Sequence, residues 1–462
     1  MLYLPSRGWK RTGAVALLLA IGLLIAATDR GRTADEPKKP DAPKKSDDKP
    51  KIEAKPDEPK PEPVVGAPSG GAAQTAEINR LLAKFWADNN ARPSRKATDY
   101  EFCRRVYLDI LGRVPAIWEV KDYVASTGRK REKLIHKLLH DPYYKEEYEE
   151  HWATVWSTLL LTRSGNKTYH EQMHEWLIEQ FGKNRPWDEI VRELLTANGE
   201  NNDNGAVNFI LAHVGDPQQD RLAEGQFDMV PVTSRTTRLF LGLQIQCTQC
   251  HNHPFNPEWK QSHFWGVNAF FRQVEREGTP LMRQNAAMPN MASKLGLKDK
   301  PEYNKDGKVF FEDRQAVMHQ TTPRFLDGKK MSDGKFASRR EALATFVIEH
   351  DQFPKAFVNR MWGHFFGRGL TQNQAVDDFG DHNQVVHPEL LEGLAKSFKE
   401  YKYNIKELIS WICNSEAYDL SVEANNTNNK PEHEVYFSRM LLKNMTPEQL
   451  FDSLRTLVFI SL

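Results

Sequence analysis

The chain has 462 residues, of which 27% are charged and 39% are hydrophobic, and its formal net charge is +1. A chain of this length can bury a sizeable core. The near-zero net charge gives no electrostatic basis for a nucleic-acid partner or for general attraction to an anionic surface. The four cysteines, Cys103, Cys247, Cys250 and Cys413, are too few in so long a chain for a disulfide scaffold.

Residues 1–27 have the pattern of a signal peptide. Arg7, Lys10 and Arg11 form a charged start, and an apolar run from Gly13 to Ala27 follows. The run is shorter than the ~20 residues that a membrane-spanning helix needs, and it has the length of a signal-peptide core. No clean small-x-small triplet closes it, so an uncleaved membrane anchor stays open as the alternative. We therefore expect an exported protein, periplasmic or at the cell surface.

Residues 28–76 are predicted to form a disordered spacer. The stretch 35–63 consists almost wholly of Lys, Asp, Glu and Pro. Such a composition cannot bury enough apolar surface to offset the entropy lost on folding. The spacer would hold the folded part away from a membrane or from neighbouring molecules.

Residues 77–277 are predicted to form a first helical domain, because apolar residues recur there at helical spacing and strand alternation is scarce. Thr98 and Glu101 resemble a capping box. Cys103 lies beside an apolar stripe and is expected in the core. The predicted helices cover residues 77–87, 131–140, 152–160, 176–182, 187–195 and 234–246, and residues 198–229 are predicted to be a loop. A further helix opens at Thr98 and places Phe102, Val106 and Ile110 on one stripe.

Residues 278–338 are rich in Gly, Pro, Met and Lys and are predicted to be a long connecting loop. A second helical domain, residues 339–462, follows it. Its expected helices cover residues 341–348 and 355–366, one begins at Pro388, and one is capped by Asn404. The last residues are apolar, so we expect this domain to be incomplete. The predicted fold class is mainly α, with two irregular multi-helix domains joined by a loop.

The stretch Cys247-Thr248-Gln249-Cys250-His251 is the most informative part of the sequence. The order C-x-x-C-H is typical of c-type haem attachment. The two thiols add to the two vinyl groups of one porphyrin edge, and the histidine that follows ligates the iron. We therefore predict covalent haem c on Cys247 and Cys250, with His251 as the axial ligand.

Other chemistry for this stretch stays open. Cys247, Cys250, His251 and His253 could bind zinc, although adjacent ligands are geometrically awkward. A redox dithiol would need a thioredoxin-like βαβ unit, and none is visible. A plain disulfide or a pair of free thiols is the structural alternative. The aromatic residues that follow, from Phe255 to Phe271, would suit a large apolar cofactor or an ordinary core.

The sixth iron ligand is not fixed by the motif. His253 lies too close to His251 in sequence to reach the opposite haem face. The candidates are His263, Met282 with its neighbours Met288 and Met291, and His213. An open sixth position would favour catalysis, and a protein ligand would favour electron transfer.

Two segments of the chain resemble known families. The runs RRVYLDILG (104–112), HW (151–152) and RLFLG (238–242), continuing through the cysteines to Phe255, resemble the planctomycete cytochrome-like domain, domain of unknown function 1549. The runs FVNRMW (357–362), FGRGL (366–370), DDF (377–379) and HPELL (387–391) resemble planctomycete-specific domain 1, domain of unknown function 1553. The resemblance implies an exported bacterial protein with a haem site and no established reaction.

Adjacent Asp377 and Asp378 precede His382 and His387, but we expect a structural ion pair with Arg360 or Arg368 rather than an acid–base site. The leading hypothesis is an exported haem protein for electron transfer or an uncharacterised redox step, with a redox partner or an extracellular substrate. The alternative is a non-redox binding or scaffold protein, related to polysaccharide machinery, with the cysteines as a structural clip or zinc site. Whether the chain is an enzyme stays open.

Overall fold

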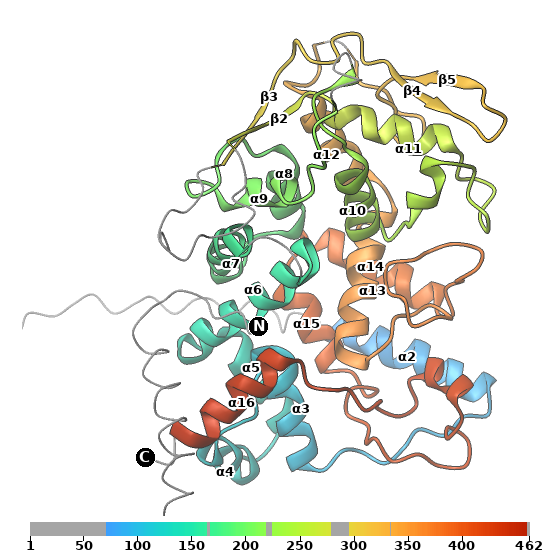
Figure 1. Cartoon of the computed structure of the whole chain (residues 1–462). Coiled ribbons are helices and arrows are strands. Elements are labelled where there is room, and N and C mark those ends of the chain that lie inside the picture. The colour runs from blue at the N-terminus through green and yellow to red at the C-terminus, as the bar shows by residue number, and fades with distance from the viewer. Residues whose placement is uncertain (1–70, 164–166, 219–223, 279–294, 333, 460–462) are drawn as a thin grey trace, which may run out of the picture. The chain divides into compact units, whose positions relative to one another are not determined.

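The structure is a computed structural model that describes residues 71–163, 167–218, 224–278, 295–332 and 334–459. The described chain is mainly helical, as predicted (Figure 1). Residues Gly70–Leu462 form one compact unit, in which the two predicted helical domains pack against each other. The predicted signal peptide and nearly all of the predicted spacer lie outside the described residues. Among the helices that the structure describes, none has both the length and the apolar character needed to cross a membrane.

The helices of the first predicted domain follow its apolar periodicity. They are α2 (Ala72–Asp88), α3 (Asp99–Leu111), α4 (Ile117–Ala125), α5 (Lys130–His140), α6 (Lys145–Leu161), α7 (Lys167–Gly182), α8 (Trp187–Thr196), α9 (Asn208–Leu211), α10 (Val230–Leu241) and α11 (Gln261–Asn268). The capping box is confirmed, because Glu101 N donates to Thr98 Oγ1 and Thr98 N donates to Glu101 Oε2. Helix α2 begins at Ala72, inside the range predicted as spacer. Helix α4 was not predicted.

Helix α10 ends before the cysteine motif, which corrects the prediction of a helix over residues 234–246. The helix begins four residues early and stops at Leu241. Gly242 follows with φ +66°, a left-handed conformation that glycine adopts without strain and that commonly ends helices. The Gly242 amide donates to the carbonyl of Arg238 at 3.1 Å. The cysteines therefore lie on a separate turn.

Residues 278–338 contain strands, which corrects the prediction of a plain loop. Strands β3 (Gly296–Asp299), β4 (Val309–Glu312) and β5 (Met318–Thr321) lie in this region, and β1 (Gly199–Glu200) and β2 (Val274–Glu277) lie before it. They form an antiparallel sheet of order β1-β3-β2 and a separate β4-β5 pair. Leu297 of β3 pairs with Gly199 and with Arg276 and is buried. The described part of this region is thus tied to the first predicted domain.

The helices of the second predicted domain begin at the expected signals. They are α12 (Arg339–Glu349), α13 (Gln352–Phe366), α14 (Pro388–Glu400), α15 (Ile405–Cys413) and α16 (Pro447–Phe459). Asn404 caps α15 by accepting from Glu407 N at 3.3 Å, and Pro388 is the first residue of α14. Cys103 is buried in the core, as expected, and Cys413 is buried as well. Burial raises the pKa of the Cys103 thiol to about 12.

Aromatic side chains from both segments share one core. Trp156 of α6 stacks on Phe357 of α13 with centroids 5.5 Å apart, and Phe357 stacks in turn on Phe398 of α14 at 4.9 Å. Trp187 of α8 lies 4.7 Å from Phe357. Helix α2 packs against α14 and α15, so the start of the described chain contacts its second half. These contacts bury large apolar areas, which makes the segments mutually dependent for stability.

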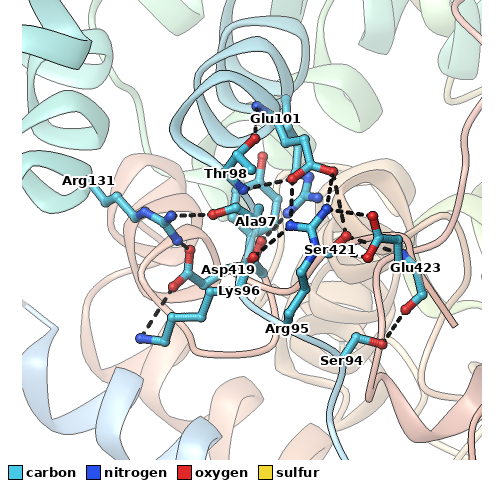
Figure 2. A network of polar contacts seen from close by, with 12 residues as sticks. Ser94, Arg95, Lys96, Ala97, Thr98, Glu101, Arg131, Asp419, Ser421 and Glu423 are labelled. Atoms are coloured by element: carbon cyan, nitrogen blue, oxygen red, sulfur yellow. Dashed lines mark hydrogen bonds and ion pairs between the residues drawn. The ribbon is translucent and has the colours of Figure 1, made fainter. Parts of the chain in front are cut away.

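A polar network also joins the two segments (Figure 2). Arg95 donates to Glu101 at 3.0 Å and to Glu423 at 2.7 Å. Arg131 forms an ion pair with Asp419 and donates to the carbonyl of Ala97. The Thr98 cap of α3 is thereby connected to residues 419–423. The hydrogen bond from Arg95 is the main cause that lowers the pKa of Glu101 to about 2.

Glu101→Gln is expected to weaken this network in a pH-dependent way. A carboxyl group whose folded pKa is lowered stabilises the fold above its unfolded pKa, about 4.5, and that contribution is lost as the pH falls toward 2. The group is partly exposed, so solvent screening limits the loss in unfolding free energy at pH 7 to about 1 kcal/mol. Glutamine can still accept in a capping box, so the helix start is retained.

Chemical denaturation of both proteins from pH 7 to pH 2 measures this effect. The difference in unfolding free energy should shrink steadily below pH 4.5. Glu132→Gln, which removes an exposed partner of Arg129, is the matched control and should change little. A Glu101→Gln difference that stays constant with pH would show that the charge is irrelevant.

Candidate functional site

The two cysteines of the motif lie on one exposed turn. They occupy the 3-10 helix η4 (Ile245–Gln249) and its C-cap, and Cys250 N donates to the carbonyl of Cys247 at 3.5 Å. Residues three apart eclipse each other on a 3-10 helix, so the two side chains project from the same side. Both thiols are free and exposed, in contrast to the buried Cys103 and Cys413. Two thiols on one face fit attachment to one edge of a porphyrin.

His251 has the hydrogen bond that a metal-ligating histidine needs. Its Nδ1 lies 2.6 Å from the carbonyl oxygen of Asn252. A carbonyl can only accept, so Nδ1 carries the proton in the neutral ring and Nε2 keeps its lone pair. Metal-bound histidines commonly donate their second ring N–H to such a carbonyl, which fixes the tautomer and the ring orientation. The thiol pair and the imidazole therefore fit the donor set of haem c.

The motif turn is held from behind by helix α11. Gln261 Nε2 and Trp265 Nε1 both donate to the carbonyl of Gln249, at 3.1 and 3.0 Å. Gln261 N donates to the side-chain oxygen of Asn252 at 3.1 Å. The backbone of the turn is thus positioned by rigid structure while its cysteines face solvent.

The His253 ring accepts hydrogen bonds from the backbone of its own loop. Its Nδ1 accepts from Phe255 N at 3.2 Å and from Asn256 N at 3.0 Å. Burial and the neighbouring His382 lower the pKa of His253. In the described part of the chain, no three His, Cys, Asp or Glu side chains are grouped so as to hold a metal ion.

The second segment reaches the motif loop through His382. The His382 ring lies 5.9 Å from the His253 ring and 5.8 Å from the Phe255 ring. His382 Nε2 is 3.0 Å from Asp378 Oδ2. Phe255 is 66% exposed, so the loop presents an aromatic surface beside the histidines. Sequence reasoning missed this proximity, because it depends on tertiary packing alone.

Two candidates for the sixth iron ligand, His213 and His263, each make a hydrogen bond in the described structure. His213 is buried and bonds the carbonyl of Leu160 at 2.8 Å, and burial lowers its pKa to about 4. His263 Nδ1 accepts from Lys260 N at 3.2 Å at the start of α11. His263 also lines a separate cavity together with Arg324. Met282, Met288 and Met291 lie outside the described residues.

The aromatic residues after the motif belong mainly to the core. Phe264, Phe270 and Phe271 are fully buried within the folded unit. The apolar periodicity of α11 and the following turn is therefore explained by packing, and these rings are not available to line a cofactor site. Phe255 is the exposed exception.

Asp377 forms the expected structural ion pair. Its carboxylate lies 3.7 Å from Arg360 Nη2 and also 2.7 Å from Arg238 Nε, a partner that the sequence did not suggest. Arg368 pairs instead with Glu434 at 3.6 Å. Phe379 N donates to the carbonyl of Gly242 at 2.8 Å. Residues 377–379 thus dock onto the end of α10, next to the cysteine turn.

These features define a mainly helical protein in which a C-x-x-C-H turn of one segment packs against an acidic loop of another. Residues 77–276 match the family PSCyt2, a protein of unknown function (DUF1549), and residues 339–458 match the family PSD1, a protein of unknown function (DUF1553). The chain therefore contains a segment similar to each of these two families, in this order. No curated protein and no solved structure matches the chain.

Proposed function

We propose that this chain is an exported haem protein, with haem c attached to Cys247 and Cys250 and His251 as an axial iron ligand. The observation that carries the proposal is the 2.6 Å contact between His251 Nδ1 and the Asn252 carbonyl, beside two free thiols on one face of a turn. Bound haem would supply one-electron exchange, in electron transfer or in an uncharacterised extracytoplasmic redox step.

The residues of the chain contribute attachment and orientation. Cys247 and Cys250 fix the position of the cofactor, and the Asn252 carbonyl keeps His251 in the tautomer that can bind iron. The cysteines are exposed, so the attachment point is at the surface, where a redox partner protein or an extracellular substrate could approach it. The predicted export signal supports the proposal, because c-type haem is attached outside the cytoplasm.

The test is expression of the exported chain together with a c-type maturation system, followed by haem staining of a denaturing gel and a pyridine haemochrome spectrum. We expect a stained band for the unaltered chain and complete loss of stain in the double variant Cys247→Ala/Cys250→Ala. Cys413→Ala is the matched control, because it removes a thiol from the core and leaves the motif unchanged.

A colourless protein from cells that mature a control cytochrome would refute the haem proposal. Zinc content and thiol state would then be measured. Stoichiometric zinc, or a Cys247–Cys250 disulfide, would support the alternative of a non-redox exported binding or scaffold protein. Staining that persists in the double variant would show that haem is held elsewhere.

A further inference from the structure

A cavity of about 320 Å³ lies between helices α6, α13 and α16, and the C-x-x-C-H motif is not part of it. Its volume is at the lower end of the range of about 300–1,000 Å³ that is typical of small-molecule sites. One wall comes from α6 and one from α13, so the two family segments meet there. In Figure 1 the labels of α6 and α13 lie near the centre, and the last helix, α16, lies below them.

Three side chains that line the cavity have a buried N–H group without an acceptor among the described residues. Trp152 and Trp156 line the cavity and are almost fully buried, and no described residue accepts a hydrogen bond from either indole Nε1. Arg360 Nε is likewise buried without an acceptor among the described residues. A buried donor without a partner destabilises a protein by about 1–3 kcal/mol, so such groups are rare without a reason. Three of them on one cavity favour a ligand that brings acceptor oxygens.

Arg360, which lines the cavity, belongs to a cluster of arginines whose other members, Arg235 and Arg238, do not line it. Arg235, Arg238 and Arg360 lie close enough to influence one another's charge, and the described structure gives them one counter-ion, Asp377. Burial lowers the pKa of Arg360 to about 10, so the guanidinium stays charged at neutral pH. Burial lowers the pKa of His151 to about 3, so its imidazole adds no charge. Acceptor oxygens that carry a negative charge would therefore be favoured here.

The lining contributed by α16 has a different character. Glu448 and Asp452 of α16 line the cavity, and Glu448 is bound by Arg163 through both carboxylate oxygens. These carboxylates would repel an anion placed at the α16 side. Met361, Val155 and Leu159 supply apolar surface to the lining of the cavity. A ligand that suits this lining is apolar along its body and anionic at the end that faces Arg360.

We propose that this cavity binds a small apolar carboxylic acid. Its carboxylate accepts from Arg360 and from the indole N–H groups of Trp152 and Trp156, and its apolar body fills the space beside Met361. The site is independent of the haem proposal, because it uses no residue of the cysteine motif.

The test is isothermal titration calorimetry of the purified chain with 2-naphthoate, and with the neutral analogue 2-naphthalenemethanol. We expect one site per chain for 2-naphthoate and at least tenfold weaker binding of the neutral analogue. Val155→Phe, which adds bulk inside the cavity, should abolish binding. Trp156→Phe keeps the ring packing and removes one donor, so it should weaken binding several-fold.

Arg360→Met should weaken 2-naphthoate binding at least tenfold and reduce the preference over the neutral analogue. Arg368→Met is the matched control, because Arg368 is also a buried arginine of the second segment but does not line the cavity. Circular dichroism establishes that each variant is folded. If 2-naphthoate does not bind at millimolar concentration, if Val155→Phe leaves binding intact, or if both ligands bind equally, the proposal is wrong. Equal affinity in Cys247→Ala/Cys250→Ala would confirm that the site is separate from the motif.

Discussion

Arg340→Ala is expected to lower the free energy of unfolding by about 3–5 kcal/mol, the usual result of leaving a buried charge pair with one partner. The Arg340 side chain is 1% exposed and lies 2.8 Å from the carboxylate of Asp299. It also donates to the carbonyls of Leu195 and Ala197, at 3.1 and 2.8 Å. One guanidinium thus joins α12, the end of α8 and strand β3.

The substitution would leave Asp299 and two carbonyls without their donor in a buried setting. Urea denaturation followed by circular dichroism measures the change in unfolding free energy. Arg129→Ala is the matched control, because Arg129 is 82% exposed and its ion pair with Glu132 is long, at 3.5 Å. Its loss should change the free energy of unfolding by less than about 1 kcal/mol. Similar midpoints for the two variants would contradict the structural role of Arg340.

The helices were predictable because their signals are local. The capping box of Thr98 and Glu101, Pro388 at a first helical position and the Asn404 cap all start helices in the structure. Helix α16 was not predicted, although the sequence carries a signal for it. Thr446 and Gln449 form the reciprocal hydrogen bonds of a capping box at its start. The end of α10 at Gly242 could also have been read from the glycine.

The strands of residues 278–338 were not predictable in the same way. Strand β3 pairs with β1, almost a hundred positions earlier in the chain, through Leu297 and Gly199. Each strand has four residues or fewer, so alternation is too short to distinguish it from a loop. Their formation depends on tertiary contacts, which no local pattern records.

The candidate site also has features that the local sequence predicts and features that depend on tertiary contacts. The common face of Cys247 and Cys250 follows from their spacing, and the structure has it on an exposed turn. Other contacts join positions more than a hundred residues apart. His382 lies beside His253, and residues 377–379 dock onto α10 through Arg238. The cavity near Arg360 is of the same kind, because α6, α13 and α16 come from different parts of the chain.

Asp377→Asn is expected to lower the free energy of unfolding by about 3 kcal/mol, because it leaves the buried Arg360 without its counter-ion. Arg235 and Arg238 would then repel Arg360 without compensation. Asp378→Asn is the matched control at the next position. Asp378 bonds His382 at 3.0 Å and forms no ion pair with an arginine of the described residues, so the substitution should lower the free energy of unfolding by about 1 kcal/mol.

The Asp377→Asn variant also tests the proposed ligand site separately from the stability of the fold. A carboxylate that faces Arg360 would replace the lost charge of Asp377, so 2-naphthoate should bind Asp377→Asn more tightly than the unaltered chain and should raise its unfolding midpoint further. Thermal denaturation with and without 2-naphthoate measures both effects. If Asp377→Asn is no less stable than Asp378→Asn, the arginine cluster does not depend on Asp377. If it is less stable but gains nothing from 2-naphthoate, the cluster needs its counter-ion and the ligand carboxylate does not face Arg360.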